Sequence, residues 1–217
     1  MNLSSFAAFY RDGGPFMHLI LLTGVAILAL TAERFWVIGR AASINSGKLV
    51  RDAVARVGKG DTPAATDLCR RVRGPVAHVA HAILSRNVTD EEHLQRAADN
   101  AASIALPPLS RRLPYLNTLA NVATLLGLLG TIFGLITAFS AVSAADPSQR
   151  SAFLAVGISQ ALNTTAFGLI IAVPTLLVHG FLVSKVEHIV DSIDEASARL
   201  IDAISRRGPS AVRDQAA

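Results

Sequence analysis

Two long stretches of this sequence carry no charged residue, and they constrain the fold more than any other feature. Residues 113–145 and 151–184 are 33 and 34 residues long, and both are charge-free when His179 is neutral. As helices each would be roughly 50 Å long, which exceeds the roughly 30 Å of a bilayer core. Only residues 146–150 separate them. They therefore predict a tight antiparallel hairpin of membrane helices that continue into water on the side of the large polar segment.

A third apolar stretch covers residues 16–38, and its only charged residues are Glu33 and Arg34 when His18 is neutral. Trp36 and Arg40 at its end are typical of a membrane–water interface. No basic region precedes the stretch and no small-residue cleavage site follows it, so we expect a retained anchor rather than a signal peptide. The chain is predicted to be an all-α membrane protein with three transmembrane helices.

Basic residues indicate the orientation of these helices. Of the 20 Lys and Arg residues, 18 fall in or beside the segment 39–115 and the C-terminal tail. The positive-inside rule places those parts in the cytoplasm and the N-terminus on the outer side of the membrane, which we expect to be a bacterial inner membrane. The net charge of +4 then needs no nucleic acid to explain it. The predicted segments are a periplasmic N-terminus (1–15), TM1 (16–38), a cytoplasmic helical domain (39–112), TM2 with its cytoplasmic extension (113–145), a periplasmic loop (146–150), TM3 (151–184), and a cytoplasmic C-terminal helix and tail (185–217).

The polar segments are predicted to be helical. Thr62 is the predicted N-cap of one helix, with Pro63 at the first helical position, and residues 89–92 (TDEE) have the pattern of a capping box that begins at Thr89. Residues 186–204 carry apolar side chains at helical spacing opposite acidic ones, so an amphipathic helix should continue from the third span. The single cysteine, Cys69, has no partner for a disulfide or a zinc site.

Polar side chains within the two hairpin spans are the candidate functional residues. Those of the second span fall within an arc of about 80°, one stripe down a helix. Polar groups at membrane depth face a protein interior or a wet cavity, so we predict a pore lining; interhelical hydrogen bonding is the alternative. The second span carries Asn117, Asn121, Thr124 and Thr131, and the third carries Gln160, Asn163, Thr164 and Thr165.

Small residues in the same spans predict close helix packing, and a proline predicts a kink or a freed carbonyl. The hairpin contains no carboxylate, and Thr, Asn and Gln do not titrate near neutral pH, so an acid should come from a partner. No nucleophile–base pair or metal cluster is visible, so neither an enzyme nor a cofactor is predicted. The packing residues are Gly127, Gly130, Gly134, Gly157, Gly168 and Pro174.

Two motifs resemble the signatures of the ExbB/TolQ/MotA proton-channel family. Residues 126–134 (LGLLGTIFG) are similar to its second-span signature, and residues 157–169 (GISQALNTTAFGL) with 172–174 (AVP) to its third. Thr131 and Thr165 match the family's pore threonines. Gln160 stands where many relatives have glutamate, which keeps hydrogen bonding without titration. The resemblance leaves open whether the ion is H⁺ or Na⁺.

The resemblance implies an ExbB-like homopentamer in membrane lipid around two copies of a single-span ExbD/TolR-like protein, whose membrane aspartate carries the proton. The expected function is the channel subunit of a molecular motor that uses proton motive force to energise a periplasmic or outer-membrane process. TonB-type transport, Tol–Pal maintenance and gliding all fit. The alternative is a non-conducting membrane scaffold that holds the single-span partner.

Overall fold

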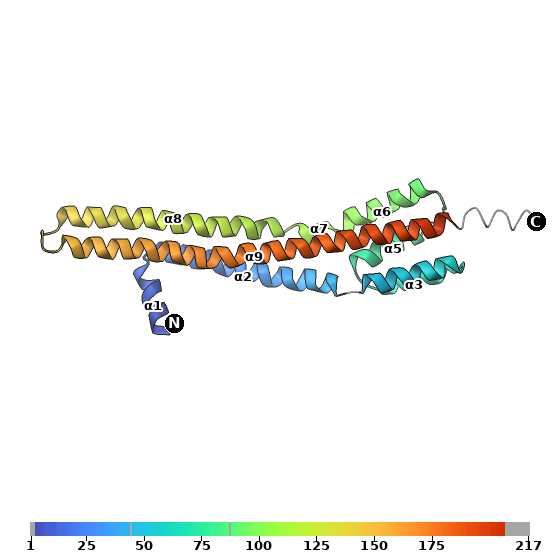
Figure 1. Cartoon of the computed structure of the whole chain (residues 1–217), viewed down its shortest axis with the longest axis horizontal. Helices are drawn as coiled ribbons and strands as arrows, with labels where there is room; N and C mark the ends of the chain where they lie inside the picture. The colour runs from blue at the N-terminus through green and yellow to red at the C-terminus, as the bar shows by residue number, and fades with distance from the viewer. Residues whose placement is uncertain (1–2, 44, 87, 207–217) are drawn as a thin grey trace, which may run out of the picture. The chain divides into compact units, whose positions relative to one another are not determined.

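The structure, a computed structural model, describes residues 3–43, 45–86 and 88–206 of the 217-residue chain. All regular secondary structure in those ranges is helical, and three helical segments are long and apolar enough to cross a membrane. The predicted all-α fold with three such helices is therefore confirmed. In chain order (Figure 1) the helices are α1 Leu3–Asp12, α2 Phe16–Ala42, α3 Ser46–Gly58, α4 Thr62–Arg71, α5 Pro75–Leu84, α6 Glu91–Ala105, α7 Pro107–Ser110, α8 Leu113–Ala144 and α9 Arg150–Ser205.

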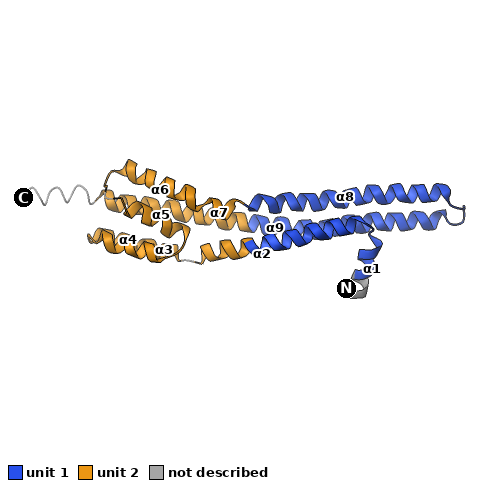
Figure 2. Cartoon of the chain, turned by 180° about the vertical axis from the view of Figure 1, so that it is seen from behind, with its two compact units in different colours: residues 1–33, 112–181 blue, residues 34–111, 182–217 orange. Residues whose placement is uncertain are grey.

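The chain divides into two compact units, coloured separately in Figure 2. Unit 1 consists of Met1–Glu33 and Arg112–Phe181, and it contains α1, most of α2, α8 and the first part of α9. Unit 2 consists of Arg34–Arg111 and Leu182–Ala217, and it contains α3 to α7 with the last part of α9. The candidate site lies in unit 1, so that unit is described first.

Unit 1 is built on the hairpin of α8 and α9. The face that α8 turns toward α9 is a buried stripe of small residues at helical spacing, including Ala123, Gly127 and Gly134. A Cβ atom added at Gly168 of α9 would lie 2.7 Å from the Ala123 carbonyl oxygen, a distance that real Cβ atoms do not adopt. The absence of a side chain there lets the two backbones approach closely.

Helix α2 packs along α9 in unit 1, and the two helices run in the same direction. Met17 and Ile20 of α2 are fully buried in a cluster with Phe167 of α9. Farther along, a Cβ atom added at Gly24 would lie 2.9 Å from Ile171 Cδ1. Burying each large apolar side chain stabilises a fold in water by about 1.5–3 kcal/mol, but in lipid the gain comes from packing rather than from hydration.

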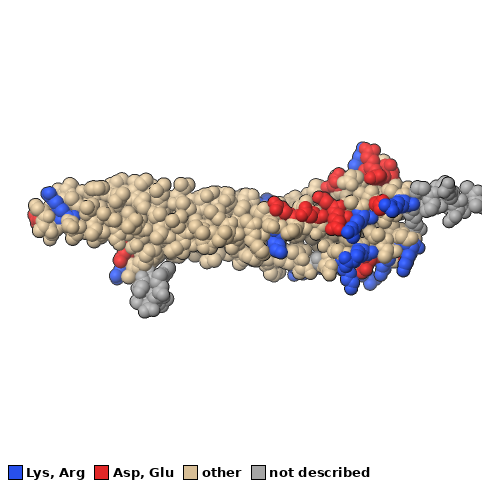
Figure 3. Space-filling model, viewed as in Figure 1, with Lys and Arg blue, Asp and Glu red and all other residues tan. Residues whose placement is uncertain are grey.

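The hairpin continues past the beginning of α2. Phe16, the first residue of α2, stacks edge-on against Phe133 of α8 with ring centroids 5.4 Å apart. Beyond Phe133, α8 continues to Ala144, which adds about 16 Å at 1.5 Å per residue. The hairpin therefore extends beyond the beginning of α2 on the side of the 146–150 loop. The visible hairpin surface is free of charge except near that loop and the α1–α2 corner (Figure 3).

Unit 2 is a bundle of amphipathic helices. The last part of α9 buries Ile189, Ile193 and Leu200 and exposes Glu187 and Asp191, as its apolar periodicity predicts. Fully or nearly fully buried residues from the other helices complete the core. They include Val57 of α3, Cys69 of α4, Val79 and Ile83 of α5, and Leu94 of α6.

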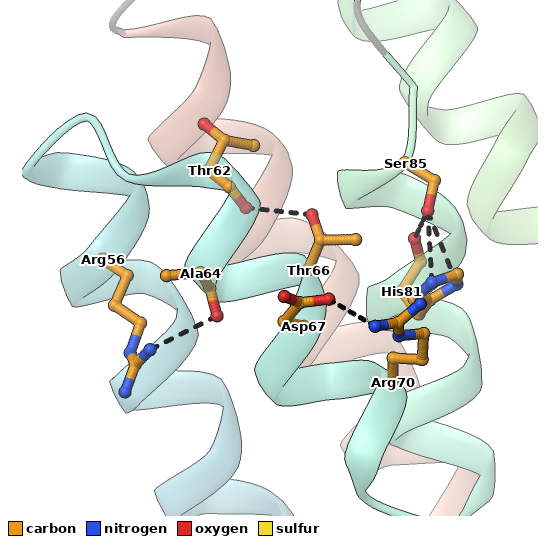
Figure 4. Close-up of polar contacts among 8 residues, drawn as sticks. All are labelled: Arg56, Thr62, Ala64, Thr66, Asp67, Arg70, His81 and Ser85. Atoms are coloured by element: carbon orange, nitrogen blue, oxygen red, sulfur yellow. Dashed lines mark hydrogen bonds and ion pairs between the residues drawn. The ribbon is translucent and has the colours of Figure 1, made fainter.

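The N-caps of two unit 2 helices differ by one residue from the prediction. The N-caps are Asp61 and Asp90, whose carboxylates accept from the amides of Ala64 and His93, rather than Thr62 and Thr89. A carboxylate interacts with the positive end of the helix dipole, which a hydroxyl does not match. Polar contacts in and between α3, α4 and α5 are drawn in Figure 4, where Arg56 Nη1 donates to the Ala64 carbonyl oxygen at 3.3 Å.

Candidate ion path on the helical hairpin

The polar stripe of α8 lies beside the buried stripe rather than within it. Asn121, Thr124 and Thr131 each follow a buried residue, so they are displaced by about 100° around the helix. Asn121 and Thr124 are exposed, and Thr131 is half-buried. Asn117, one turn before Asn121, is also exposed. These four residues form a polar strip beside the face that α9 covers, with the exposed Leu128 between Thr124 and Thr131 on the same side of α8.

The stripe also faces away from α2. Phe133 marks the side of α8 that contacts α2, because its ring packs against Phe16. Thr131 lies two residues earlier, which places it about 200° around the helix from Phe133. The strip that contains Thr131 is thus open to another protein chain.

The threonine hydroxyls of the stripe donate their hydrogen bonds to carbonyl oxygens of α8 itself. Thr131 Oγ1 donates to the Leu128 carbonyl oxygen at 2.6 Å, and Thr124 Oγ1 donates to that of Ala120 at 3.2 Å. A hydroxyl that has donated its proton still offers lone pairs. Both threonines can therefore accept a hydrogen bond from a protonated carboxyl group, or contact a cation.

Thr165 of α9 joins the two helices. It is half-buried, and its Oγ1 donates to the Gly127 carbonyl oxygen of α8 at 3.0 Å. Gly127 lies one turn before Thr131. The structure thus brings the two threonines that match the family's pore positions to neighbouring levels of the hairpin.

The other polar residues of α9 lie on a different flank. Gln160 is about 140° around α9 from Thr165 and is half-buried, and its side chain fills the space beside Gly14. Thr164 is fully buried, and its Oγ1 donates to the Gly13 carbonyl oxygen at 2.8 Å. Asn163 is half-buried. The structure therefore does not bring Gln160 and Thr164 together with the α8 stripe.

The small residues lie where the helices touch. A Cβ atom at Gly134 would lie 3.1 Å from the Ala161 nitrogen, and one at Gly157 would lie 3.0 Å from the Gly134 carbonyl oxygen. Gly130 lies against the Thr164 side chain. Pro174 lies inside α9, which remains helical through it. Close contact between α8 and α9 thus depends on glycines at three consecutive levels.

Ionisable groups lie at the ends of the unit 1 helices. Arg112 Nη1 donates to Glu33 Oε1 at 2.5 Å, which joins the beginning of α8 to α2. Near the other end of α2, Tyr10 stacks on His18, and its hydroxyl lies 3.1 Å from His18 Nδ1. No group of three or more potential metal ligands occurs among the described residues. The hairpin itself contributes no carboxylate between Leu113 and Ala144.

The corner between α1 and α2 was not predicted as part of this region. Gly13 is buried and Gly14 has a φ of +76°, a backbone conformation that favours glycine. The Gly-Gly-Pro sequence at residues 13–15 is the signal that could have indicated a sharp corner. Its contact with α9 depends on the tertiary fold, so no local pattern reveals it.

Comparison with known proteins gives consistent similarities. A model of the MotA/TolQ/ExbB proton channel family matches residues 71–195. The chain is 24% identical over 186 residues to a biopolymer transport protein ExbB homologue of Methanothermobacter thermautotrophicus, covering 85% of this chain and 65% of the relative. It is 32% identical over 161 residues to the biopolymer transport protein ExbB-like 3 of Synechocystis sp., covering 72% and 75%.

A shorter match is 36% identical over 107 residues to the Tol-Pal system protein TolQ of Haemophilus influenzae, covering 49% of this chain and 45% of TolQ. The chain therefore spans slightly less than two thirds of the Methanothermobacter relative and less than half of TolQ. The matched region includes the whole of α8 and the part of α9 that carries the polar residues.

Proposed function

This chain belongs to the MotA/TolQ/ExbB proton channel family, and on that premise we propose that it is the channel subunit of a motor driven by proton motive force. Its family and its three apolar helices make it a multi-pass protein of the inner membrane. The motor would energise a periplasmic or outer-membrane process of the TonB, Tol–Pal or gliding type. The proposed orientation has the N-terminus in the periplasm and the C-terminus in the cytoplasm.

The exposed polar strip of α8 is the observation that carries this proposal. Asn121 and Thr124 are exposed and Thr131 is half-buried, on a helix whose other exposed positions are largely apolar. Polar side chains facing lipid are costly, so a strip of them indicates that protein or water lies opposite. Thr165 borders the strip through its bond to Gly127.

We propose that the strip is half of an ion path and that a partner supplies the other half. None of the strip residues titrates near neutral pH, so they can solvate a proton carrier but cannot carry the proton themselves. A single-span protein of the ExbD/TolR type, with a membrane aspartate, would supply the carboxyl group. Five copies of this chain around two copies of that partner is the proposed assembly.

Proton flow into liposomes tests the proposal. The chain and its partner are reconstituted together, and a membrane potential drives uptake that a trapped pH-sensitive dye reports. Thr131→Val should abolish uptake, because it removes the hydroxyl from the strip while keeping the side-chain volume. Thr137→Val is the matched control, because Thr137 is exposed on the same helix, bonds to its own helix and lies about 120° from Thr131.

The scaffold alternative predicts different results. If the chain only holds its partner in the membrane, replacing the partner's membrane aspartate with asparagine should leave the cellular phenotype unchanged. Proton uptake in liposomes should then be absent for every variant. Counting subunits by native mass spectrometry tests the assembly separately, and a count of four or six copies of this chain would contradict the pentamer.

A further inference from the structure

Thr164 lies where three segments of unit 1 meet. Its side chain is fully buried, and its Oγ1 donates to the carbonyl oxygen of Gly13 in the α1–α2 corner at 2.8 Å. On the opposite side, a Cβ atom added at Gly130 of α8 would lie 2.8 Å from Thr164 Cβ. The corner and α8 therefore both contact this residue of α9.

The two glycines of the corner lie close against the side chains of Met17 in α2 and Gln160 in α9. Gly14 has a φ of +76°, and a Cβ atom added there would collide with Gln160 Nε2. A Cβ atom at Gly13 would come within 2.7 Å of Met17 Sδ. The α1 helix that precedes the corner rests on the same face of α9, because the Tyr10 and Phe167 rings pack edge to face at 6.0 Å. The corner and α1 are thus seated on α9 at the level of Thr164.

Thr165, the next residue, bonds α9 to α8 rather than to the corner. Thr165 Oγ1 donates to the Gly127 carbonyl oxygen of α8, about 100° around the helix from Thr164. The two Cα atoms are about 3.8 Å apart, so a rotation or shift of α9 that strains one bond also strains the other. Thr164 Oγ1 also lies 2.7 Å from the Gln160 carbonyl oxygen, so its single proton is shared between an acceptor on its own helix and one in the corner.

We propose that Thr164 is a positioning residue of the ion path rather than part of its lining. Its hydroxyl fastens the Gly13–Gly14 corner to α9, and this contact fixes the rotation of α9 and the height of Thr165 beside the α8 strip. The inference rests on the proposed function, since it assigns Thr164 a role in that path. The proposal also gives Gln160 a packing role, because its side chain lies against Gly14 of the corner.

Three variants and two measurements test this role in the complete complex. Thr164→Val removes the hydroxyl and keeps the branched shape, whereas Thr164→Ser keeps the hydroxyl. Thr175→Val is the matched control, because Thr175 is a buried threonine of α9 whose Oγ1 bonds only to Ile171 of its own helix. Amide hydrogen exchange over residues 3–20 reports the seating of the corner, and proton uptake by liposomes reports the path.

We expect Thr164→Val to speed exchange over residues 3–20 roughly fivefold, as the loss of one hydrogen bond allows. Proton uptake should fall about tenfold, because Thr165 loses its alignment with the α8 strip. Thr164→Ser should restore both, and Thr175→Val should change neither.

Each other outcome decides against the role. Unchanged exchange in Thr164→Val contradicts the fastening, and if uptake falls at the same time, Thr164 lines the path instead. Faster exchange with normal proton uptake shows that the contact between the corner and α9 does not affect the ion path. If the unmodified complex passes no protons, the proposed function fails, and exchange still decides whether Thr164 holds the corner.

Discussion

Thr165 Oγ1 donates to the Gly127 carbonyl oxygen at 3.0 Å, so a side chain of α9 bonds directly to the backbone of α8. In the helical pattern of α8 the same carbonyl accepts from the amide of Thr131. One carbonyl therefore links the hydroxyl of one candidate pore threonine to the backbone of the other. The two threonines are therefore held in a fixed relation to each other.

This relation predicts that the two threonines differ in their effect on stability. Thr165→Val should lower the free energy of unfolding by about 1 kcal/mol, because it removes a hydrogen bond between helices. Thr131→Val should cost less, because the Thr131 hydroxyl bonds only within its own helix. Thermal unfolding of the purified chain in detergent measures both.

Proton uptake should respond differently from stability. Both variants should lose uptake, although only Thr165→Val lowers the melting temperature appreciably. Thr165→Ser keeps the donor and should retain the stability of the unmodified chain. Equal melting temperatures for Thr165→Val and the unmodified chain would show that the bond to Gly127 contributes nothing to the hairpin.

A second prediction concerns the closest approach of the two helices. Gly168→Ala places a Cβ atom 2.7 Å from the Ala123 carbonyl oxygen and 3.3 Å from Gly127 Cα, and both are backbone atoms that cannot move independently. The helices must separate, at a cost of about 1–3 kcal/mol. The melting temperature should fall accordingly.

Gly180→Ala is the matched control for this change. Gly180 lies in the same helix, and a Cβ atom added there would meet nothing within 4 Å. Alanine is the better helix former by about 0.5–1 kcal/mol, so this variant should be neutral or slightly stabilising. If both variants behaved alike, helix propensity rather than close packing would explain the glycines.

The sequence predicts the membrane helices well, because each is specified by its own composition. An uncharged, largely apolar span of 33 residues strongly favours a membrane helix. The observed helix α8 ends at Ala144, one residue before the end of that span. The polar stripe is also a local property, since the helical period alone places Asn121, Thr124 and Thr131 on one side.

The arrangement around α9 could not be predicted in the same way. Gln160, Thr164 and Thr165 are close in sequence, but Gln160 contacts the α1–α2 corner, Thr164 contacts both the corner and α8, and Thr165 bonds to α8. Periodicity gives the angle between two side chains on a helix, but not which neighbour occupies each direction. That information comes from Gly13 and Gly14, which are about 150 residues away along the chain.

A third prediction concerns the ion pair at the beginning of α8. Arg112 Nη1 contacts Glu33 Oε1, and the two side chains are 53% and 37% exposed. Reversing either charge, in Glu33→Arg or Arg112→Glu, places like charges together and should lower the melting temperature. The double reversal should recover most of the loss, because the pair forms again with its signs exchanged.

Salt provides the control for this pair. Exposed charges are screened within about 10 Å at 0.1 M ionic strength, so the differences among the four proteins should shrink as salt increases. Losses that persist at high salt would indicate that the substitutions disturb the packing of α2 on α8 rather than an electrostatic contact. A double reversal no better than the single changes would lead to the same conclusion.

The last prediction concerns Cys69, the buried thiol of α4 in unit 2. Burial raises its pKa from the ordinary value to about 11, because the thiolate would lose its hydration. At pH 8 the reactive thiolate fraction should therefore be roughly a hundredfold smaller than for an exposed cysteine. Alkylation by iodoacetamide, followed by mass spectrometry, should be correspondingly slow.

A relocated thiol separates burial from reagent access. Cys69→Ala combined with Ala55→Cys moves the single thiol to an exposed position of α3, where it should react at the rate of a free cysteine. Equal rates in the two proteins would contradict the buried environment of Cys69.

The same thiol should make unit 2 sensitive to alkaline pH. The folded thiol keeps its proton to higher pH than the unfolded one, so deprotonation favours the unfolded chain. The contribution is intact below about pH 8.5 and is lost as pH rises toward 11. Cys69→Ala should remove this part of the alkaline loss of stability, and an identical pH profile in both proteins would show that Cys69 titrates as it does in the unfolded chain.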